Sequence, residues 1–313
     1  MSKNDNAKVI IATVGQLAEC PNPFDSGDAG RAPKILACAS LPYKNPKPEQ
    51  LVNGSWVREN GDYSLVVQGG LQGIPYGMYP RLFLFWLTSE VHRTGSREIS
   101  TGHSFADFCR QLNIDASRGK RGPGAKMIEQ VERLLDARIS YVARRETKRS
   151  LRSDASHMSI ADDRSLFWDA SRPEQESLFD SKIVLTERFF KELTDHNIPL
   201  DMRVVNAIRE RKSPLELDIL LWLNYRLFAL YNQKTHATVT WEQLYNQFGS
   251  GFSRLRDFRN QAFIPAIRAV CAFYSHADVT IDESGLLLGP SAPLIPRKWY
   301  ATGGQLDLKK GGA

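Results

Sequence analysis

The sequence predicts a mixed α+β protein in which one structural plan, three helices followed by a β-hairpin, occurs twice. Two sets of three segments carry apolar residues at helical spacing, and each set is followed by two short runs rich in β-branched or apolar residues. Hydrophobic residues make up 42% of the chain and charged residues 24%, as in globular proteins. A chain of 313 residues can bury one or two cores of ordinary size.

The N-terminal part of the chain is expected to be an arm. Residues 1–62 are rich in Pro, Gly, Asn and Asp, and the prolines from Pro21 to Pro48 prevent long helices. Alternating residues from Tyr63 to Gln68 predict the first strand. We therefore predict a largely irregular arm over 1–62, a first domain over 63–196, a second domain over 197–297 and a flexible C-terminal tail over 298–313.

Three helices are predicted for the first domain. Residues 79–93 repeat apolar residues at helical spacing, and Ser104 is the expected N-cap of a short helix over 105–112. A third helix over 124–138 directs Met127, Val131, Leu134 and Leu135 inward. Its opposite face is expected to be exposed, polar and basic, and it consists of Lys126, Gln130, Arg133 and Ala137.

A hairpin is predicted after the third helix. It consists of a strand over 139–144, a basic loop over 146–156 and a returning strand over 158–168. A closing strand over 182–185 and a helix over 187–195, with Thr186 as its N-cap, complete the first domain.

The same order recurs in the second domain. Ser213 and Pro214 open a helix over 215–231, and a capping box of Thr240 and Gln243 opens a helix over 240–248. A third helix over 253–274 precedes a hairpin of 279–281 and 286–288. This is the element order of winged-helix domains. The predicted fold is therefore two tandem winged-helix domains, mainly helical with small β-hairpin wings.

The distribution of charge favours a polyanionic partner. The formal net charge is +6, and residues 116–152 alone contain eleven Lys and Arg residues against four acids. The glycine-rich loop 117–124 brings three of these cations next to a helix N-terminus, which itself favours anions. In the second domain, basic residues crowd the first turns of 253–274, where they oppose the helix dipole.

These patterns are typical of duplex DNA binding by a helix-turn-helix, whose second helix enters the major groove. Arg and Asn are also the side chains that pair bidentately with guanine and adenine. A solvated loop and surface arginines with buried stems are the alternatives. The residues predicted to contact DNA are Arg118, Lys120, Arg121, Lys126, Gln130, Arg133, Arg144, Arg145, Lys148, Arg149, Ser253, Arg254, Arg256, Arg259 and Asn260.

Several motifs add a resemblance to a known family. They are Gly73-Ile-Pro-Tyr-Gly-Met-Tyr-Pro-Arg-Leu82, Phe85-Trp-Leu87, Glu90-Val-His-Arg-Thr-Gly-Ser-Arg-Glu98 and Ser104-Phe-Ala-Asp-Phe-Cys-Arg-Gln-Leu112, with Ala37-Cys-Ala-Ser-Leu-Pro-Tyr43 upstream. Over about residues 37–145 the chain resembles the plasmid-encoded RepA replication initiators. Phe263-Ile-Pro-Ala-Ile267 is similar, more weakly, to a Pro-Ala element in the last helix of winged-helix initiators.

The resemblance implies a function and several partners. It implies binding to repeated sites, called iterons, at a plasmid origin, local strand opening, and recruitment of the host initiator and the replicative helicase. It also implies a homodimer–monomer equilibrium and a location in the bacterial cytoplasm. A transcriptional repressor without an origin function is the alternative, and an adaptor that uses the helix over 217–231 for protein contacts is a third reading.

Enzymatic activity, a metal and a cofactor are not expected. Gly119 to Lys126 lacks the hydroxyl residue of a phosphate-binding P-loop, and the six histidines are too scattered for a nickase metal site. Asp162 and Asp163 are expected to face water. The four cysteines form no metal-binding or disulfide pattern and are expected to be reduced thiols. No apolar run is long enough to span a membrane, and no secretory signal is recognised, so a cytoplasmic protein is expected.

Overall fold

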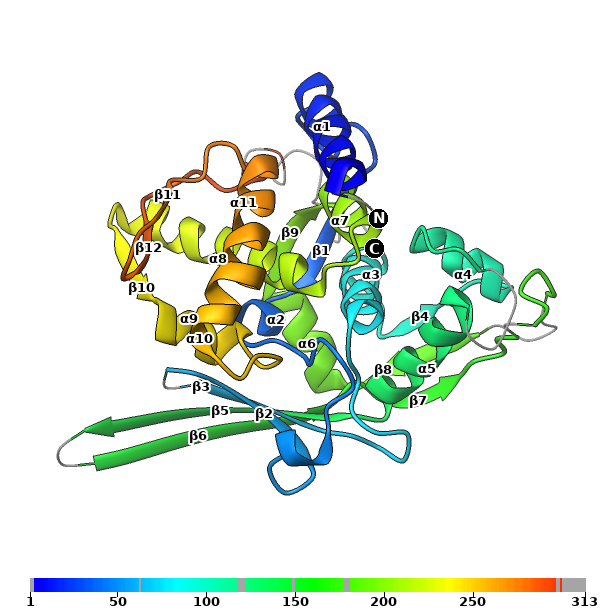
Figure 1. The fold of residues 1–313 in the computed structure, drawn as a ribbon. Coiled ribbons are helices and arrows are strands. Elements are labelled where there is room, and N and C mark those ends of the chain that lie inside the picture. The colour runs from blue at the N-terminus through cyan, green and yellow to red at the C-terminus, as the bar shows by residue number, and fades with distance from the viewer. Residues whose placement is uncertain are drawn as a thin grey trace, which may run out of the picture. The chain divides into compact units, whose positions relative to one another are not determined.

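The chain folds into two compact units, and the computed structural model describes residues 3–61, 63–116, 122–147, 150–169, 171–176, 181–296 and 299 (Figure 1). The central unit contains residues 32–197 and 246–251. The terminal unit combines residues 1–31 with 198–245 and 252–313. Residues 32–62, which we predicted to belong to the N-terminal arm, therefore belong to the central unit.

The central unit combines helices with two antiparallel sheets. Its helices are α2 (Ile35–Cys38), α3 (Met78–Thr94), α4 (Phe105–Gln111), α5 (Pro123–Leu135) and α6 (Glu187–Asp195), with a 3-10 turn at Pro48–Gln50. One sheet has the order β2-β3-β5-β6, formed by β2 (Ser55–Asn60), β3 (Tyr63–Gln68), β5 (Arg138–Thr147) and β6 (Ser150–Ser159). The other has the order β4-β8-β7, formed by β4 (Glu98–Ser100), β8 (Lys182–Leu185) and β7 (Ala161–Ser165).

The hairpin of β5 and β6 is longer than predicted. Its backbone ladder continues to the pair Thr147 and Ser150, whereas β3 pairs with β5 only as far as Ala143. The expectation of a loop over 146–156 is therefore wrong. Sequence patterns predict a strand from an alternating apolar face that packs on a core. The part of the hairpin beyond β3 is formed by backbone hydrogen bonds between β5 and β6, and these bonds require no such face.

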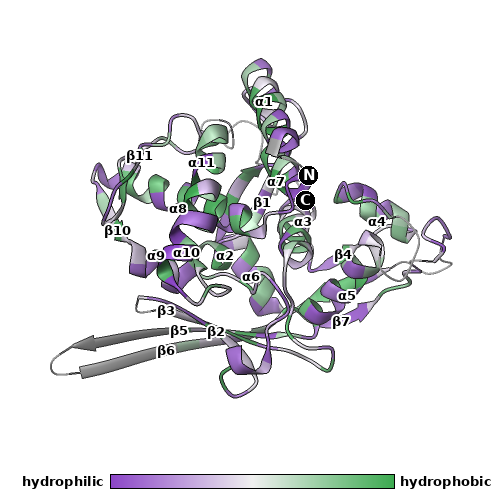
Figure 2. Ribbon diagram, viewed as in Figure 1, coloured by the Kyte–Doolittle hydropathy of each residue, from purple (hydrophilic) through white to green (hydrophobic). Residues whose placement is uncertain are grey.

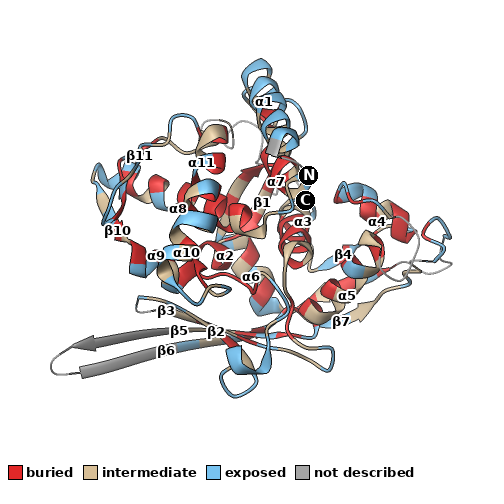
Figure 3. Cartoon of the chain, viewed as in Figure 1, coloured by how far each residue is buried: buried red, intermediate tan, exposed pale blue. Residues whose placement is uncertain are grey.

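Helix α3 forms the middle of the central unit's core. All residues from Pro80 to Thr88 are buried, more than the single apolar face that its helical repeat predicted (Figure 3). Phe83 and Trp86 contact Phe108 of α4 in edge-on geometry, and Trp168 stacks on Phe108 at 4.5 Å between ring centroids. The predicted N-cap of α4 is confirmed, because Ser104 Oγ accepts a hydrogen bond from the Asp107 backbone N–H at 3.1 Å.

The terminal unit is mainly helical. Its helices are α1 (Lys3–Glu19), α7 (Met202–Glu210), α8 (Pro214–Gln233), the first five residues of α9 (Trp241–Phe248), α10 (Leu255–Asp257), a π-helix (Phe258–Phe263) and α11 (Ile264–Phe273). Hydrophobic residues dominate α8 and α11, which pack together (Figure 2). Strands β1 (Ala29–Pro33) and β9 (Asn197–Asp201) pair, and a second sheet has the order β10-β12-β11, formed by β10 (Ala237–Thr240), β12 (Gly285–Leu288) and β11 (Val279–Ile281). The predicted hairpin of 279–281 and 286–288 is confirmed.

Residues 3–19 form helix α1, although we predicted a largely irregular arm there. The prolines of the N-terminal region begin only at Pro21, after this helix ends. Arg203 of α7 donates to the carbonyl oxygen of Cys20 at 2.7 Å, and Arg211 donates to that of Asn6 at 3.2 Å. These two arginines hold α1 through its backbone. In the part of the chain that the structure describes, no helix is both long and apolar enough to cross a membrane.

Candidate nucleic-acid interface

A groove of about 520 Å³ in the terminal unit brings together several of the residues predicted to contact DNA. Its walls come from the start of α9, from α10 and the π-helix, and from the turn between β11 and β12. We call it the terminal groove. It is lined by Thr240, Trp241, Glu242, Leu255, Arg256, Arg259, Asn260, Glu283 and Ser284.

Local hydrogen bonds fix the start of α9 at one wall of the groove. The Gln243 N–H donates to Thr240 Oγ1 at 3.3 Å, and Gln243 Oε1 accepts from the Thr240 N–H at 2.9 Å. This confirms the predicted capping box. The Trp241 indole N–H donates to the carbonyl oxygen of Asp282 at 3.2 Å, so the helix start is bound directly to the β11–β12 turn.

The β11–β12 turn is held by one carboxylate. Asp282 Oδ1 accepts hydrogen bonds from the Ser284 hydroxyl and from the N–H groups of Ser284 and Gly285, at 2.7, 2.7 and 2.9 Å. These bonds, the hydroxyl first, lower the pKa of Asp282, and the nearby charge of Arg259 lowers it further. A lowered carboxyl pKa stabilises the fold above the unfolded-state pKa, and this contribution is lost as the pH falls through the lowered value.

Gly285 allows β12 to approach the start of α9. It pairs with Thr240, and a Cβ atom at this position would lie 2.0 Å from the carbonyl oxygen of Val239. We expect Gly285→Ala to destabilise the terminal unit by about 1–3 kcal/mol, because the clash is with backbone and cannot be relieved by a side-chain rotation. Urea unfolding measures this change. Gly251→Ala is the matched control, since open space surrounds that position, and equal stabilities of the two variants would contradict the prediction.

Arg259 occupies the junction of the three walls. Its guanidinium carbon lies 4.7 Å from the centroid of the Trp241 ring, and its Nη2 donates to the Asp282 carbonyl oxygen at 3.4 Å. The Arg259 side chain is half-buried, and it makes both this hydrogen bond and a cation–π contact with Trp241. Arg259 therefore positions the helix start and the turn relative to the π-helix, in addition to bringing positive charge to the groove.

The remaining predicted residues of this segment are exposed. Arg256 and Asn260 line the groove. Ser253 and Arg254 are exposed too but do not line it, and the Arg254 side chain forms an ion pair with Asp257 at 2.7 Å. Arg254 and Arg256 are thus both exposed and lie two residues apart, but only Arg256 is among the residues that line the groove.

The helix predicted over 253–274 is three consecutive helical segments, with a π-helix in the middle. Pro265 has no N–H to donate to the carbonyl of residue 261, which explains why the regular ladder is interrupted just before it. Phe258 and Phe263 of the π-helix are fully buried and contact Tyr245 and Trp241. Pro265 was the sequence signal for this irregularity.

In the central unit, the expectation of an exposed polar face on α5 is wrong for three of its four residues. Lys126 is exposed, but Gln130 and Ala137 are only 3% and 1% exposed. Gln130 Oε1 accepts from the Tyr76 N–H at 2.8 Å, and Arg133 donates to the Ile74 carbonyl oxygen at 3.2 Å. A helical repeat shows which residues share a face but not whether that face is exposed. Here the face opposite the apolar one also packs, against the segment that precedes α3.

The other predicted residues of the central unit are two arginines of β5 and five residues that the structure does not describe. Arg144 and Arg145 belong to β5, where they pair with Ser153 and Arg152 of β6. Five further residues lie outside the part of the chain that the structure describes, namely Arg118, Lys120, Arg121, Lys148 and Arg149.

The motifs that carried the family resemblance have structural roles. Gly77, at φ +78°, precedes the first residue of α3, and the fully buried Arg81 donates to the carbonyl oxygens of Gly77 at 2.6 Å and Leu41 at 2.7 Å. The motif at 73–82 is thereby fastened to the motif at 37–43. Gly95 ends α3 in left-handed conformation, and Arg97 binds the Leu185 carbonyl oxygen and pairs with Asp162 at 2.7 Å.

Solved structures with a similar fold come from another protein. Two crystal structures of domains 2 and 3 of RctB are similar, each with a TM-score of 0.40. The first has 11% identity and covers 76% of this chain and 85% of its own, and the second has 10% identity and covers 81% and 94%. No curated protein sequence matches the chain.

A family model described as "Plasmid encoded RepA protein" matches residues 74–243, which is more than half of the chain. The match includes α3, α4 and α5 with the motifs around the buried Arg81 and around Arg97, and it extends through α8 to the start of α9. The resemblance seen in the motifs is therefore confirmed, and the chain belongs to the family of plasmid-encoded RepA proteins, which are replication initiators.

Proposed function

We propose that this protein initiates plasmid replication by binding repeated duplex DNA sites, the iterons, at the plasmid origin. Binding would be followed by local strand opening and by recruitment of the host initiator and the replicative helicase. Membership of the RepA family is the observation that carries this proposal. The proposed role is that of a DNA-binding protein in the bacterial cytoplasm, without an enzymatic step or a cofactor.

The order and pairing of elements in the terminal unit support a winged-helix domain. Helix α8, strand β10, helix α9, the segment from α10 to α11 and the β11–β12 hairpin follow one another, and β12 lies between β10 and β11. In this arrangement the segment from α10 onward is the recognition helix, and its early residues meet base edges in the major groove. The hairpin is the wing. Arg256 and Asn260 stand at the positions that such a helix uses for base contacts.

The charges of the terminal groove favour base reading over phosphate binding. Glu242 and Glu283 line it together with Arg256 and Asn260. Carboxylates repel phosphates, but they accept hydrogen bonds from the N4 amino group of cytosine, while Arg and Asn pair with guanine and adenine. A groove of mixed charge with donors and acceptors is therefore suited to discrimination between base pairs.

The central unit supports a second winged-helix element with a different role. Helices α3, α4 and α5 are followed by the long β5–β6 hairpin, in the order expected for a wing. Lys126 is exposed on α5, and residues 116–152 account for the whole net charge of the chain. We propose that this segment, including Arg118, Lys120, Arg121, Arg144, Arg145, Lys148 and Arg149, binds phosphates and so holds the protein on any duplex.

Footprinting of the purified protein on the plasmid that encodes it tests the proposal. We expect protection of regularly spaced direct repeats beside an AT-rich segment. Affinity should fall by about 10³-fold or more between 50 and 200 mM salt if six or more phosphates are contacted. Protection of a single inverted repeat over a promoter would favour a repressor instead. Weak binding with little salt dependence would favour the adaptor, and the absence of any footprint would contradict both DNA-binding readings.

A further inference from the structure

Helix α1 carries apolar residues on two sides. Buried or half-buried residues follow one side, at Val9, Ile10, Thr13 and Leu17, and α1 packs against α7 and α11. A second apolar stripe faces outward and consists of four exposed residues, Ala7, Ile11, Val14 and Ala18 (Figure 3). We call it the α1 stripe. A helix on the surface of a globular protein ordinarily has one apolar stripe and a polar opposite face, so this second stripe is apolar surface that the terminal unit leaves uncovered.

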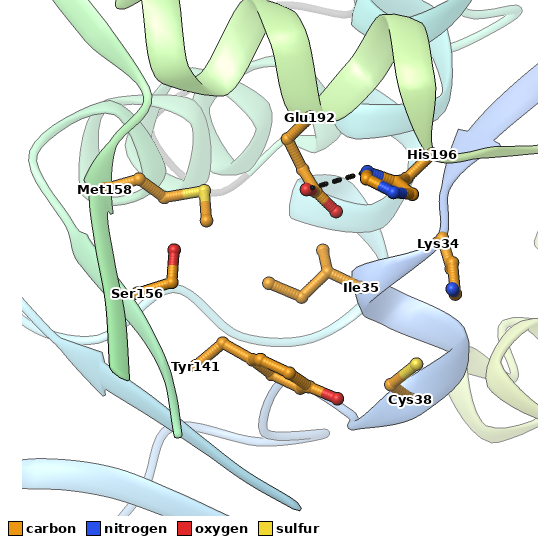
Figure 4. Close-up of a pocket in the computed structure, with 8 residues that line it drawn as sticks. All are labelled: Lys34, Ile35, Cys38, Tyr141, Ser156, Met158, Glu192 and His196. Atoms are coloured by element: carbon orange, nitrogen blue, oxygen red, sulfur yellow. Dashed lines mark ion pairs between the residues drawn. The ribbon is translucent and has the colours of Figure 1, made fainter. Parts of the chain in front are cut away.

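Elsewhere in the described chain, large apolar residues near the surface are sheltered or lie singly. In a cavity of about 240 Å³ between α2, α6 and the β5–β6 hairpin, for example, Ile35 and Met158 line the walls and are buried (Figure 4). Ile11, by contrast, is 71% exposed, and the exposed Val14 lies one helical turn away. The other exposed large apolar residues come from five separate segments, at Val52, Leu71, Phe167, Tyr231 and Leu287. Single exposed apolar residues are normal, whereas adjacent ones on one helix face favour a contact surface.

The spacing of the α1 stripe is that of a helix pair. Its residues follow one another at intervals of four, three and four, and this alternation is typical of the contact seam between two helices. The order is also symmetric, with the larger Ile11 and Val14 in the middle and Ala7 and Ala18 at the ends. An antiparallel second copy of α1 would bring Ile11 opposite Val14 and Ala7 opposite Ala18. The stripe is therefore complementary to itself across a two-fold axis.

The charges beside the stripe favour the antiparallel direction. Lys8 and Glu19 are both exposed, and their separation of about three helical turns places them on the same side of the stripe. In an antiparallel pair, Lys8 of each copy comes close to the level of Glu19 of the other, so two pairs of opposite charge form. A parallel pair would bring Lys8 beside Lys8 and Glu19 beside Glu19. Charge complementarity thus selects one direction of pairing.

The stripe is open and its helix is held in place. Arg203 and Arg211 donate hydrogen bonds to the backbone carbonyl oxygens of Cys20 and Asn6, which fixes the helix at both ends. A Cβ atom at Gly15, next to the stripe, would have no atom within 4 Å. A second helix can therefore approach a surface that is already formed, which lowers the entropic cost of association.

We propose that the α1 stripe binds the α1 stripe of a second copy of this chain in an antiparallel helix pair. Ile11 and Val14 form the centre of the contact, Ala7 and Ala18 its ends, and a pair of Lys8 with Glu19 flanks each end. One helix face buries less than the about 800 Å² per partner of a standard interface, so the dimer is weak and forms at high protein concentration. This proposal does not rest on the proposed function, because the two helices would pair in the absence of DNA.

Sedimentation equilibrium of the full-length protein without DNA tests the proposal. We expect a monomer below about 1 μM and a dimer with a Kd on the order of 100 μM. Ile11→Lys should weaken self-association about tenfold or more, because each dimer loses two buried isoleucine side chains. Val52→Lys is the matched control, since Val52 is 58% exposed and lies outside α1, and its Kd should equal that of the unmodified protein. A single mass at all concentrations, or a dimer that Ile11→Lys leaves unchanged, would overturn the proposal.

Charge reversals test the direction of pairing. Lys8→Glu and Glu19→Lys should each weaken the dimer about threefold to tenfold at low salt, because like charges replace two attractive pairs. The variant with both reversals should regain the Kd of the unmodified protein, since opposite charges face each other again. Lys191→Glu, at an exposed position of α6, is the control for a change of net charge. Single reversals without effect, or a double variant as weak as the single ones, would contradict the antiparallel pair.

Discussion

Replacing Arg256 and Asn260 together by alanine should reduce the preference of this protein for its origin repeats over scrambled duplex by about 10²- to 10³-fold. Each bidentate contact to a base contributes about 1–3 kcal/mol of discrimination, and both residues line the terminal groove with exposed side chains. Affinity for scrambled duplex should change little, because that affinity comes from phosphate contacts. Competition binding with cognate and scrambled duplexes at one salt concentration measures the ratio.

Arg254→Ala is the matched control for this prediction. It removes an arginine of the same segment that is exposed but paired with Asp257 and does not line the groove. Its discrimination ratio should stay close to that of the unmodified protein. If the double variant kept its ratio, or if Arg254→Ala lost as much, base reading by the terminal groove would be wrong, whatever footprint the protein gave on the plasmid.

The sequence predicted best what depends on a few neighbouring residues. The N-caps Ser104, Thr186, Ser213 and Thr240 are all confirmed, because a cap needs only a side-chain oxygen and an N–H two or three residues further on. The β11–β12 hairpin is confirmed for the same reason. Its turn depends on Asp282 and Gly285, which are close in the chain.

Features that depend on distant partners could not be predicted in this way. A helical repeat showed that Gln130 and Arg133 lie opposite the apolar face of α5, but not that the segment around Tyr76 covers them. The composition of the first 62 residues gave no indication of α1. The backbone carbonyl oxygens of this segment accept hydrogen bonds from Arg203 and Arg211, which lie nearly two hundred residues later in the chain. In the terminal groove, the sequence identified Arg256, Arg259 and Asn260, whereas the contribution of Trp241, Glu242 and Glu283 required the folded chain.

The buried Arg81 leads to the second large expected effect, on stability. Its guanidinium is completely buried, donates to the carbonyl oxygens of Gly77, Leu41 and Pro42, and lies 5.2 Å from the centroid of the Tyr43 ring. We expect Arg81→Leu to destabilise the central unit by about 3–5 kcal/mol, because the Gly77 and Leu41 carbonyl oxygens would each lose a hydrogen bond from a charged donor. Arg81→Lys should be destabilised as well, since an ammonium group lacks the planar fork that reaches several oxygens at once.

Thermal and urea unfolding measure this effect, and Arg93→Leu on the same helix is the control. Arg93 is exposed and pairs with Glu90 one turn away, so its replacement should cost no more than about 1 kcal/mol. Equal stabilities of Arg81→Leu and Arg93→Leu would show that the hydrogen bonds of Arg81 between the motifs at 37–43 and 73–82 contribute nothing to the free energy of unfolding. If Arg81→Leu is destabilised as expected, its loss of DNA binding at higher temperature should follow the unfolded fraction and affect cognate and scrambled duplexes alike. The Arg256 and Asn260 variant, by contrast, should lose discrimination while its unfolding midpoint stays unchanged, and this difference would separate residues that stabilise the fold from residues that we propose to read DNA.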